Sequence, residues 1–207
     1  MSPPARTDSV DSTPADLDET NISCTFNIYK PAFRRHYEIK SAHDQPLYYV
    51  NISSFKPNKP SLTLHSSHSP TSPIIAASKF LKLSSDCKLA LGDPEDLTNT
   101  QYRFEMAIPN IDGNGHGHGE RRVFIWKRTH SVKVENTRAF PLSLRSFKLI
   151  EERTGQVVAV FSRERSITKC GKLQIRVEYG EDFAKMVLIS WLSLFEKASG
   201  GGGGGGG

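Results

Sequence analysis

The segment 183–195, FAKMVLISWLSLF, constrains the fold more than any other part of the chain. Ten of its 13 residues are apolar, and the exceptions, Lys185, Ser190 and Ser193, do not form a wide polar face on a helix. A helix that is apolar nearly all round must be buried on all sides. At 1.5 Å per residue it would be about 20 Å long, short of the roughly 30 Å of a bilayer span. The segment therefore predicts a helix in the interior of the protein.

The ends of this helix are also marked in the sequence. Glu181 and Asp182 place negative charge at its N-terminus, Lys197 lies near its C-terminus, and Gly200 ends it.

The chain between Asn21 and this helix reads as a series of short strands. Leu173, Ile175, Val177 and Tyr179 give the clearest alternation of apolar and polar positions. About eleven or twelve strands at this spacing indicate a sandwich or a barrel. The expected strands cover residues 24–28, 48–52, 62–64, 74–83, 88–91, 102–108, 123–127, 132–135, 147–151, 157–161 and 173–179.

A half-polar sheet and a wholly apolar helix have few compact arrangements. Closing the sheet around the helix buries both apolar surfaces and removes exposed strand edges. We therefore expect a mainly β fold, a closed barrel of about twelve strands threaded by the C-terminal helix. The alternative is a sandwich with the helix wedged at one open end.

Composition divides the chain into three parts. Residues 1–20 contain three prolines, five acids and one arginine, and are expected to form a disordered acidic tail. Residues 21–198 form the expected barrel domain, and residues 199–207 form a flexible glycine-rich tail. Since the first 20 residues carry a charge of −4 and the whole chain +5, the rest of the chain carries +9. The folded part is distinctly basic, which favours solubility or attraction to phosphate groups.

The C-terminal part resembles a known group of proteins. A hairpin turn at Thr154-Gly155, then Gly180-Glu181-Asp182 leading into an apolar helix, is similar to the tubby C-terminal-like superfamily. This superfamily includes tubby proteins, plant LURP-one-related proteins and phospholipid scramblases. The resemblance covers residues 21–198, is specific over 147–198, and is greatest to the LURP-one-related and short fungal members. It implies a twelve-stranded barrel around a hydrophobic helix. The tubby C-terminal signature is absent, so tubby's phosphoinositide contacts do not carry over to residues of this chain.

Basic clusters are the candidate ligand-binding sites. If strands 157–165 and 171–179 form a hairpin, four of their cations can share one polar surface, with Lys169 at its tip. A second cluster surrounds Trp126, and a third comprises Arg34, Arg35 and His36. Such surfaces could bind anionic headgroups, or be ordinary solvated strand faces. The candidate residues of the first two clusters are Arg163, Arg165, Lys172 and Arg176, and Arg121, Arg122, Lys127 and Arg128.

Other motifs point to no chemistry. His116 and His118 lie in a glycine-rich loop that we expect to be an exposed hairpin loop rather than a metal site. No nucleophile elbow pairs a serine with a base, no RNA-binding motif or recognition helix occurs, and the three cysteines match no zinc spacing. Ser69-Pro70, Ser72-Pro73 and Thr13-Pro14 could be sites for proline-directed kinases. We expect no catalytic residues, no metal, no cofactor and no nucleic-acid partner.

Three functions remain open. The first is a non-enzymatic module that binds anionic membrane lipid, such as phosphoinositide headgroups, through its basic surface. The second is a protein-interaction adaptor regulated by the N-terminal tail and the Ser/Pro-rich loop. The third, lipid scrambling, would require the terminal helix to span a membrane. Since the N-terminus lacks an apolar signal segment, we expect a cytoplasmic protein, peripheral at a membrane if it binds lipid. We also expect a monomer.

Overall fold

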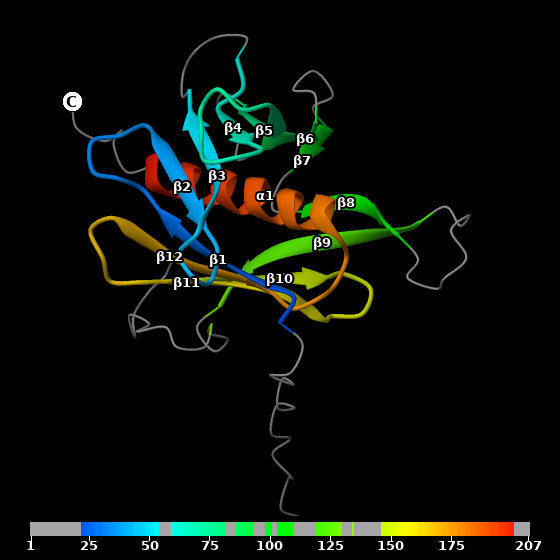
Figure 1. Ribbon diagram of the computed structural model, residues 1–207. Helices are drawn as coiled ribbons and strands as arrows, with labels where there is room; N and C mark the ends of the chain where they lie inside the picture. Colours follow the sequence, from blue (N-terminus) through cyan, green and yellow to red (C-terminus); the bar gives the residue numbers. More distant parts are fainter. Residues whose placement is uncertain are drawn as a thin grey trace, which may run out of the picture.

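A computed structural model describes residues 22–53, 59–81, 86–92, 98–100, 103–109, 119–129, 134 and 146–200. Within these residues, twelve strands form one continuous antiparallel sheet, which curves around the C-terminal helix (Figure 1). The strands are β1 (Cys24–Tyr29), β2 (His36–Lys40), β3 (Pro46–Ile52), β4 (Leu62–His65), β5 (Ile74–Phe80), β6 (Cys87–Leu91), β7 (Thr98–Thr100), β8 (Arg103–Ile108), β9 (Glu120–Arg128), β10 (Phe147–Glu151), β11 (Val157–Arg163) and β12 (Lys169–Ile175).

The order of strands in the sheet is β7-β6-β5-β4-β3-β2-β1-β12-β11-β10-β9-β8. Strands that follow each other in the chain are therefore neighbours in the sheet, with two exceptions: β7 and β8 are not paired, and β1 pairs with β12. One sheet surrounds the helix in the part of the chain that the structure describes, which argues against the sandwich alternative. Within the described residues the sheet ends at β7 and β8, with no ladder between them, so closure into a barrel stays a prediction.

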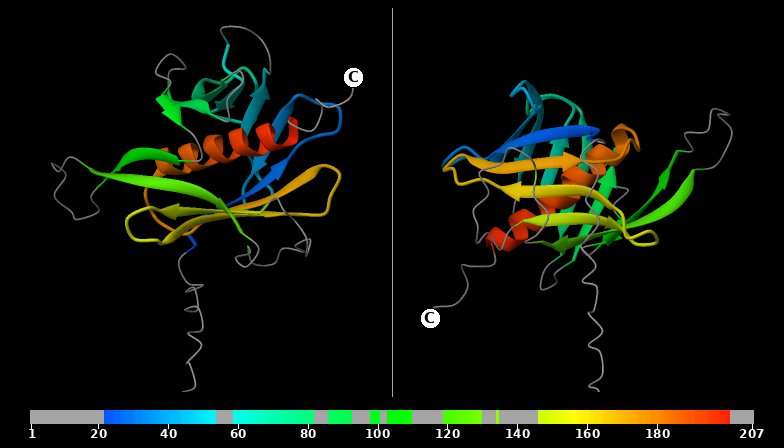
Figure 2. Two further views of the ribbon diagram at one scale, coloured as in Figure 1. Left: turned by 180° about the vertical axis from the view of Figure 1, so that it is seen from behind. Right: turned by 90° about the horizontal axis from the view of Figure 1, so that it is seen from below.

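The predicted buried helix is confirmed. Helix α1 (Glu181–Gly200) lies along the inside of the curved sheet, and every residue from Met186 to Phe195 is buried (Figure 2). Its two internal serines do not need water: Ser190 Oγ donates to the Val187 carbonyl at 3.1 Å, and Ser193 Oγ to the Ile189 carbonyl at 2.6 Å. Ser190 also accepts a hydrogen bond from Trp126 Nε1 of β9 at 3.0 Å.

Aromatic rings along α1 pack against rings of the sheet. Phe183 packs on Phe124 with ring centroids 5.0 Å apart, at the end where the helix begins. Trp191, in the middle of the helix, packs on Phe161 of β11 at 4.0 Å, and Phe195, nearer the end where the helix stops, packs on the same ring at 5.9 Å. We name the two ends of the molecule after α1 (Figure 1). The helix begins at the entry end. It stops at the loop end, where the β1–β2 and β11–β12 loops also lie.

Several strand predictions need correction. Strand β2 was not expected, although Tyr37 and Ile39 alternate and are both fully buried. The expected strand 173–179 is shifted, because β12 ends at Ile175 and the chain then turns toward α1. The expected strand 132–135 lies outside the described residues apart from Val134, which is in no strand. The hairpin at Thr154-Gly155 is confirmed: Gly155 has a φ of 72° and its N–H donates to the Glu151 carbonyl at 2.9 Å.

Gly171 occupies a position in β12 where no side chain fits. Its φ is 153°, and an added Cβ would lie 2.2 Å from the Ser162 carbonyl oxygen and 2.7 Å from Cζ of Phe161. We expect Gly171→Ala to lower the free energy of unfolding by more than about 2 kcal/mol, through overpacking and backbone strain together. Urea unfolding measures this. Gly155→Ala is the control, because nothing lies within 4 Å of its Cβ position, so an equal loss in both variants would contradict the packing account.

Candidate functional site

The loop end brings together two loops that are far apart in the sequence. Since β1 pairs with β12, the β1–β2 loop (residues 30–35) lies beside the β11–β12 loop (residues 164–168). The Lys30 N–H donates to the Thr168 carbonyl at 2.7 Å, which continues the ladder from the strands into the loops. We call these two segments the loop pair. Both loops point away from the sheet at the same end of the molecule (Figures 1 and 2).

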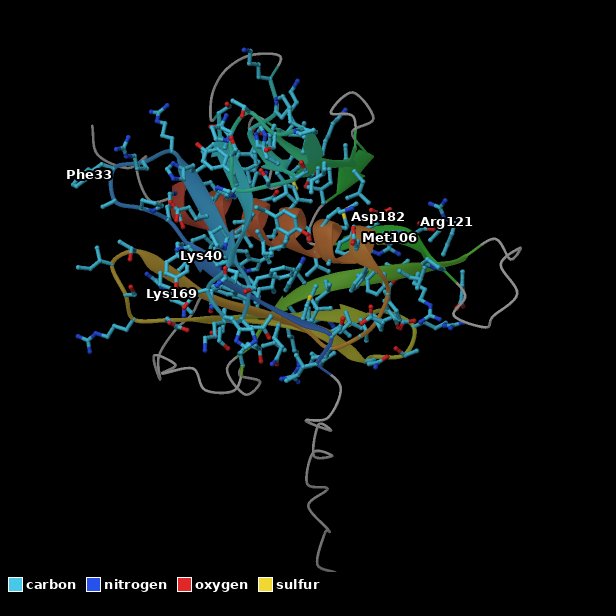
Figure 3. All side chains as sticks on the ribbon, viewed as in Figure 1. Phe33, Lys40, Met106, Arg121, Lys169 and Asp182 are labelled. Atoms are coloured by element: carbon cyan, nitrogen blue, oxygen red, sulfur yellow. The ribbon has the colours of Figure 1, made fainter. Side chains whose placement is uncertain are left out.

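Each loop of the pair exposes one large apolar side chain at its tip. Phe33 has a relative exposure of 106% and Ile167 of 92%. The other exposed large apolar residues in the described part of the chain, Ile22 and Ile74, reach only 40% and 38%. Figure 3 shows Phe33 projecting outward at the loop end. These two side chains therefore differ from ordinary surface hydrophobics, which are partly covered by their neighbours.

The backbone at Phe33 is one that glycine normally adopts. Phe33 has a φ of 60° in a turn that is closed by a 3.2 Å hydrogen bond from the Arg34 N–H to the Pro31 carbonyl. A positive φ at the third residue of such a turn strongly favours glycine, and a bulky side chain there costs on the order of 1 kcal/mol. Phe33 thus occupies an unfavourable position without any packing contact that would explain it.

Cations surround the two apolar tips. Arg34, Arg35 and Arg165 are exposed, and Arg163 and Lys169 are half-buried at the base of the loops. The acid of the loop pair, Glu164, forms an ion pair with Lys169 at 3.1 Å. The three exposed arginines therefore give this end a positive surface around Phe33 and Ile167.

The base of the loop pair is tied to the end of α1. Lys30 turns inward and donates to the two carboxylate oxygens of Glu196 at 3.1 and 2.8 Å, and Tyr37 also donates to that carboxylate. Burial, with the nearby Glu196 carboxylate, raises the pKa of Tyr37, so it stays a donor. Burial also raises the pKa of the neighbouring Cys170 thiol to about 11, despite the nearby charges of Lys30 and Arg163. The raised pKa favours the protonated form of the Cys170 thiol. Lys30 acts as a support rather than as part of the exposed surface.

The predicted four-cation surface on β11 and β12 is wrong in its arrangement. The register pairs Ser162 with Lys172 and Arg163 with Gly171. Side chains directly opposite each other share a face, so Arg163 lies on the face of Phe161, toward the interior, and Lys172 lies on the outer face. Arg165 follows the end of β11 and belongs to the loop pair.

The outer face that carries Lys172 and Arg176 is largely covered. Its residues Gln174 and Ser162 are buried, and the Val134 N–H donates to Ser162 Oγ at 2.8 Å. Arg176 is half-buried and donates from Nε to the Gln174 side chain at 3.3 Å. Lys172 and Arg176 therefore point outward as predicted, but on a surface less open than expected.

The predicted cluster around Trp126 is also divided. Arg121 and Lys127 lie on the outer face of β9, where Arg121 forms a 2.6 Å ion pair with Glu105. Arg122 and Arg128 lie on the inner face, like Phe124, and are separated by six residues, about 20 Å of strand. Arg128 lies toward the loop end, next to a cavity of about 210 Å³ that is also lined by Trp126, Phe147, Leu194 and Ala198.

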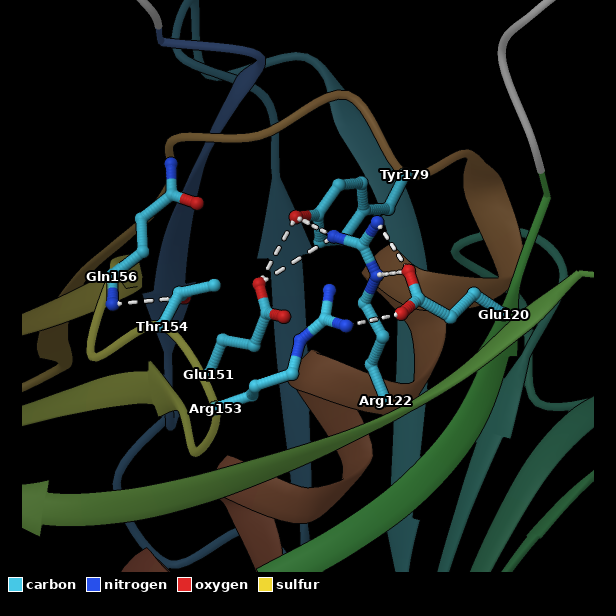
Figure 4. Close-up of polar contacts among 7 residues, drawn as sticks. All are labelled: Glu120, Arg122, Glu151, Arg153, Thr154, Gln156 and Tyr179. Carbon is cyan, nitrogen blue, oxygen red and sulfur yellow. Dashed lines mark hydrogen bonds and ion pairs between the residues drawn. The ribbon is translucent and has the colours of Figure 1, made fainter.

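Arg122 belongs instead to a polar network at the entry end (Figure 4). Its Nη1 donates to the Tyr179 hydroxyl at 2.8 Å and lies 3.5 Å from Oε2 of Glu151, and its Nε and Nη2 contact Glu120 at 3.1 and 3.0 Å. Arg153 pairs with the other oxygen of Glu120 at 2.7 Å. We call these five residues the Arg122 network.

Glu151 lies deepest in this network. Its side chain is 1% exposed, and its Oε1 has no hydrogen-bond partner among the residues that the structure describes. Burial alone would lower the pKa of Arg122, but the nearby Tyr179, Glu151 and Glu120 outweigh burial, so this pKa is raised. Burial also raises the pKa of Tyr179. Both donors therefore keep their protons and stabilise the Glu151 carboxylate. The network joins β9, the end of β10 with the turn that follows it, and the segment that leads into α1.

Sequence reasoning missed the most informative of these residues. The signal for Glu151 was present, since it continues the inward alternation of Phe147 and Leu149. Phe33 and Ile167 could have been noticed as lone apolar residues within basic loops. Which residues lie next to Glu151, and that Phe33 and Ile167 lie on neighbouring loops, depends on strand pairing across the whole chain.

Two other motifs of the sequence lie apart from these sites or outside the described residues. The His116 and His118 loop lies outside the described residues, and no group that could hold a metal ion occurs in the part of the chain that the structure covers. Ser69 is half-buried and hydrogen-bonded to Thr71 at 2.8 Å, within the turn before β5.

Comparison with known proteins adds little about these residues. No protein-family model and no curated protein matches the sequence. Among solved structures, a protein of Arabidopsis thaliana known from X-ray crystallography is similar to this chain at 10% identity and a TM-score of 0.49. The match covers 86% of this chain and 94% of that one. A likeness at this level says nothing of the residues at either end of the sheet or of what they do.

Proposed function

We propose that this chain is a non-enzymatic module that binds anionic membrane surfaces peripherally through its loop end. The observation that supports this is the convergence of three exposed arginines, Arg34, Arg35 and Arg165, from two hairpin loops at opposite ends of the sequence. The other basic residues considered as ligands are divided between two faces of the sheet. They therefore form no comparable surface.

The expected strength of this attraction follows from the charges. A Lys or Arg close to an anionic bilayer contributes about 1 kcal/mol, so three arginines contribute about 3 kcal/mol, or roughly a hundredfold in affinity. Cations farther than about 10 Å from the lipid are largely screened at physiological salt. The affinity for the bilayer therefore depends more on the cations at the end that faces it than on the total charge of +5.

Binding would be peripheral. In the part of the chain that the structure covers, no helix is long and apolar enough to cross a bilayer. The apolar surface of α1 is already covered by the sheet, so membrane contact depends on surface residues.

Removing charge from the loop end should weaken membrane binding. We expect Arg34→Gln/Arg165→Gln to bind vesicles containing phosphatidylserine about thirtyfold less tightly than the native protein, with a weaker dependence on salt. Co-sedimentation with vesicles of phosphatidylcholine, with and without phosphatidylserine, measures this. The matched control is Arg103→Gln/Arg121→Gln, which removes the same charge from exposed residues of β8 and β9 and should change affinity by no more than about twofold.

Two results would contradict the proposal. Equal recovery of the native protein on neutral and anionic vesicles would remove the lipid function and favour the adaptor function. An equal loss in the test and control variants would mean that net charge, and not the loop end, sets the affinity.

A further inference from the structure

We propose that Phe33 and Ile167 insert into the bilayer at the boundary between headgroups and acyl chains, while the arginines around them bind the headgroups. The insertion rests on the proposed function and specifies how the loop end contacts the bilayer. The two side chains are the most exposed large apolar residues in the described part of the chain. They lie three residues and one residue from the Lys30–Thr168 hydrogen bond that holds the two loops side by side.

The form of this surface fits a bilayer better than a folded protein. A stable protein interface buries about 800 Å² on each partner, over a continuous and complementary patch. Here two isolated side chains project from separate loop tips, and each loop also carries exposed arginine. A bilayer accepts such projections without a matching pocket, since apolar groups of peripheral proteins enter it by about 5–10 Å and cations remain at the headgroups.

The turn at Phe33 supports the same conclusion. Glycine would be the favourable residue at a φ of 60° in this turn, and the Phe33 side chain has no covering contact to offset the strain. A large apolar side chain held there costs the folded protein stability. Transfer of that side chain from water into an apolar layer would account for its presence, because it strengthens binding about ten- to a hundredfold.

The loop pair is also braced for such a contact. Lys30 joins the base of the first loop to Glu196 at 2.8 Å, and Lys169 joins the base of the second loop to Glu164 at 3.1 Å. The tips therefore project from a supported base.

The test replaces the two tips while keeping every charge. Phe33→Gly/Ile167→Ser should be at least as stable as the native protein in urea unfolding, because glycine relieves the turn and neither side chain is buried. Its affinity for phosphatidylserine-containing vesicles should fall at least about thirtyfold. Ile74→Ser, which removes an apolar side chain of 38% exposure from β5, should bind as the native protein does.

Depth can be measured directly with Phe33→Trp. Trp126 and Trp191 are buried, so a change in fluorescence on vesicle binding can be assigned to the added indole at position 33. Vesicles should shift its emission to the blue, and lipids brominated on the upper acyl chain should quench it. Native binding that persists in the Phe33→Gly/Ile167→Ser variant, or an indole that brominated lipids do not quench, would overturn insertion and leave a purely electrostatic contact. Failure of the native protein to bind anionic vesicles would overturn both proposals.

Discussion

Replacing Leu188 with aspartate is expected to prevent folding. Leu188 is fully buried in the middle of α1, within a run of ten buried residues from Met186 to Phe195. An unpaired carboxylate at this position would lose its water without gaining a partner, which costs several kcal/mol. Together with the lost packing, that cost approaches the whole stability of a typical domain, about 5–15 kcal/mol. Circular dichroism and thermal unfolding should show no cooperative transition.

A graded series separates burial from charge. Leu188→Ala removes the packing alone and should lower the free energy of unfolding by about 2–5 kcal/mol. Ala198→Asp places the same charge on an exposed position of the last turn of α1, where the expected cost is about 1 kcal/mol or less. A soluble Leu188→Asp variant that unfolds cooperatively would refute the enclosed helix.

The second large effect is expected in the Arg122 network. Arg122→Met leaves the Glu151 carboxylate buried without its cation, and removal of one partner from such a pair costs about 3–5 kcal/mol. The double variant Arg122→Met/Glu151→Leu should recover most of this loss, since no buried charge is then left unpaired. Urea unfolding of the four proteins gives the coupling energy between the two side chains.

Arg153→Met is the control for this cycle. Arg153 pairs with Glu120, but its side chain is 69% exposed, and such surface ion pairs contribute about 1 kcal/mol or less. If Arg122→Met and Arg153→Met were equally mild, Glu151 would have to be stabilised by something other than Arg122.

The sequence predicts the fold best in segments where nearly all residues are apolar. Ten apolar residues in 13 leave a helix no exposed face, so its burial did not depend on the rest of the chain. Strand β2 was missed for the opposite reason. Its alternation of Tyr37 and Ile39 lies in a strand of only 5 residues that begins just after Arg34 and Arg35, too short a pattern to distinguish a strand from a polar loop.

The candidate site was less predictable, because it depends on register. The spacing of Arg163 and Lys172 is compatible with one shared face only if the hairpin pairs residues of opposite parity. The actual pairs, Ser162 with Lys172 and Arg163 with Gly171, exclude this. A shift of one residue reverses every face, and nothing near these residues in the sequence sets it. The meeting of Arg122 with Tyr179 likewise depends on how the sheet brings β9 to the segment before α1.

The pairing of β1 with β12 also has a consequence for how the chain finds its fold. Every other described strand pair joins neighbours in the sequence, so two meanders, β1 to β7 and β8 to β12, can each form from local hairpins. Only the ladder that joins Cys24 to Ile175 must close a loop of nearly the whole domain. Loop closure over long distances costs entropy before any contact repays it, which slows folding more than it reduces stability. Pairing of β1 with β12 is therefore the folding step that joins the two halves of the molecule. The same step brings the two loops of the loop pair together.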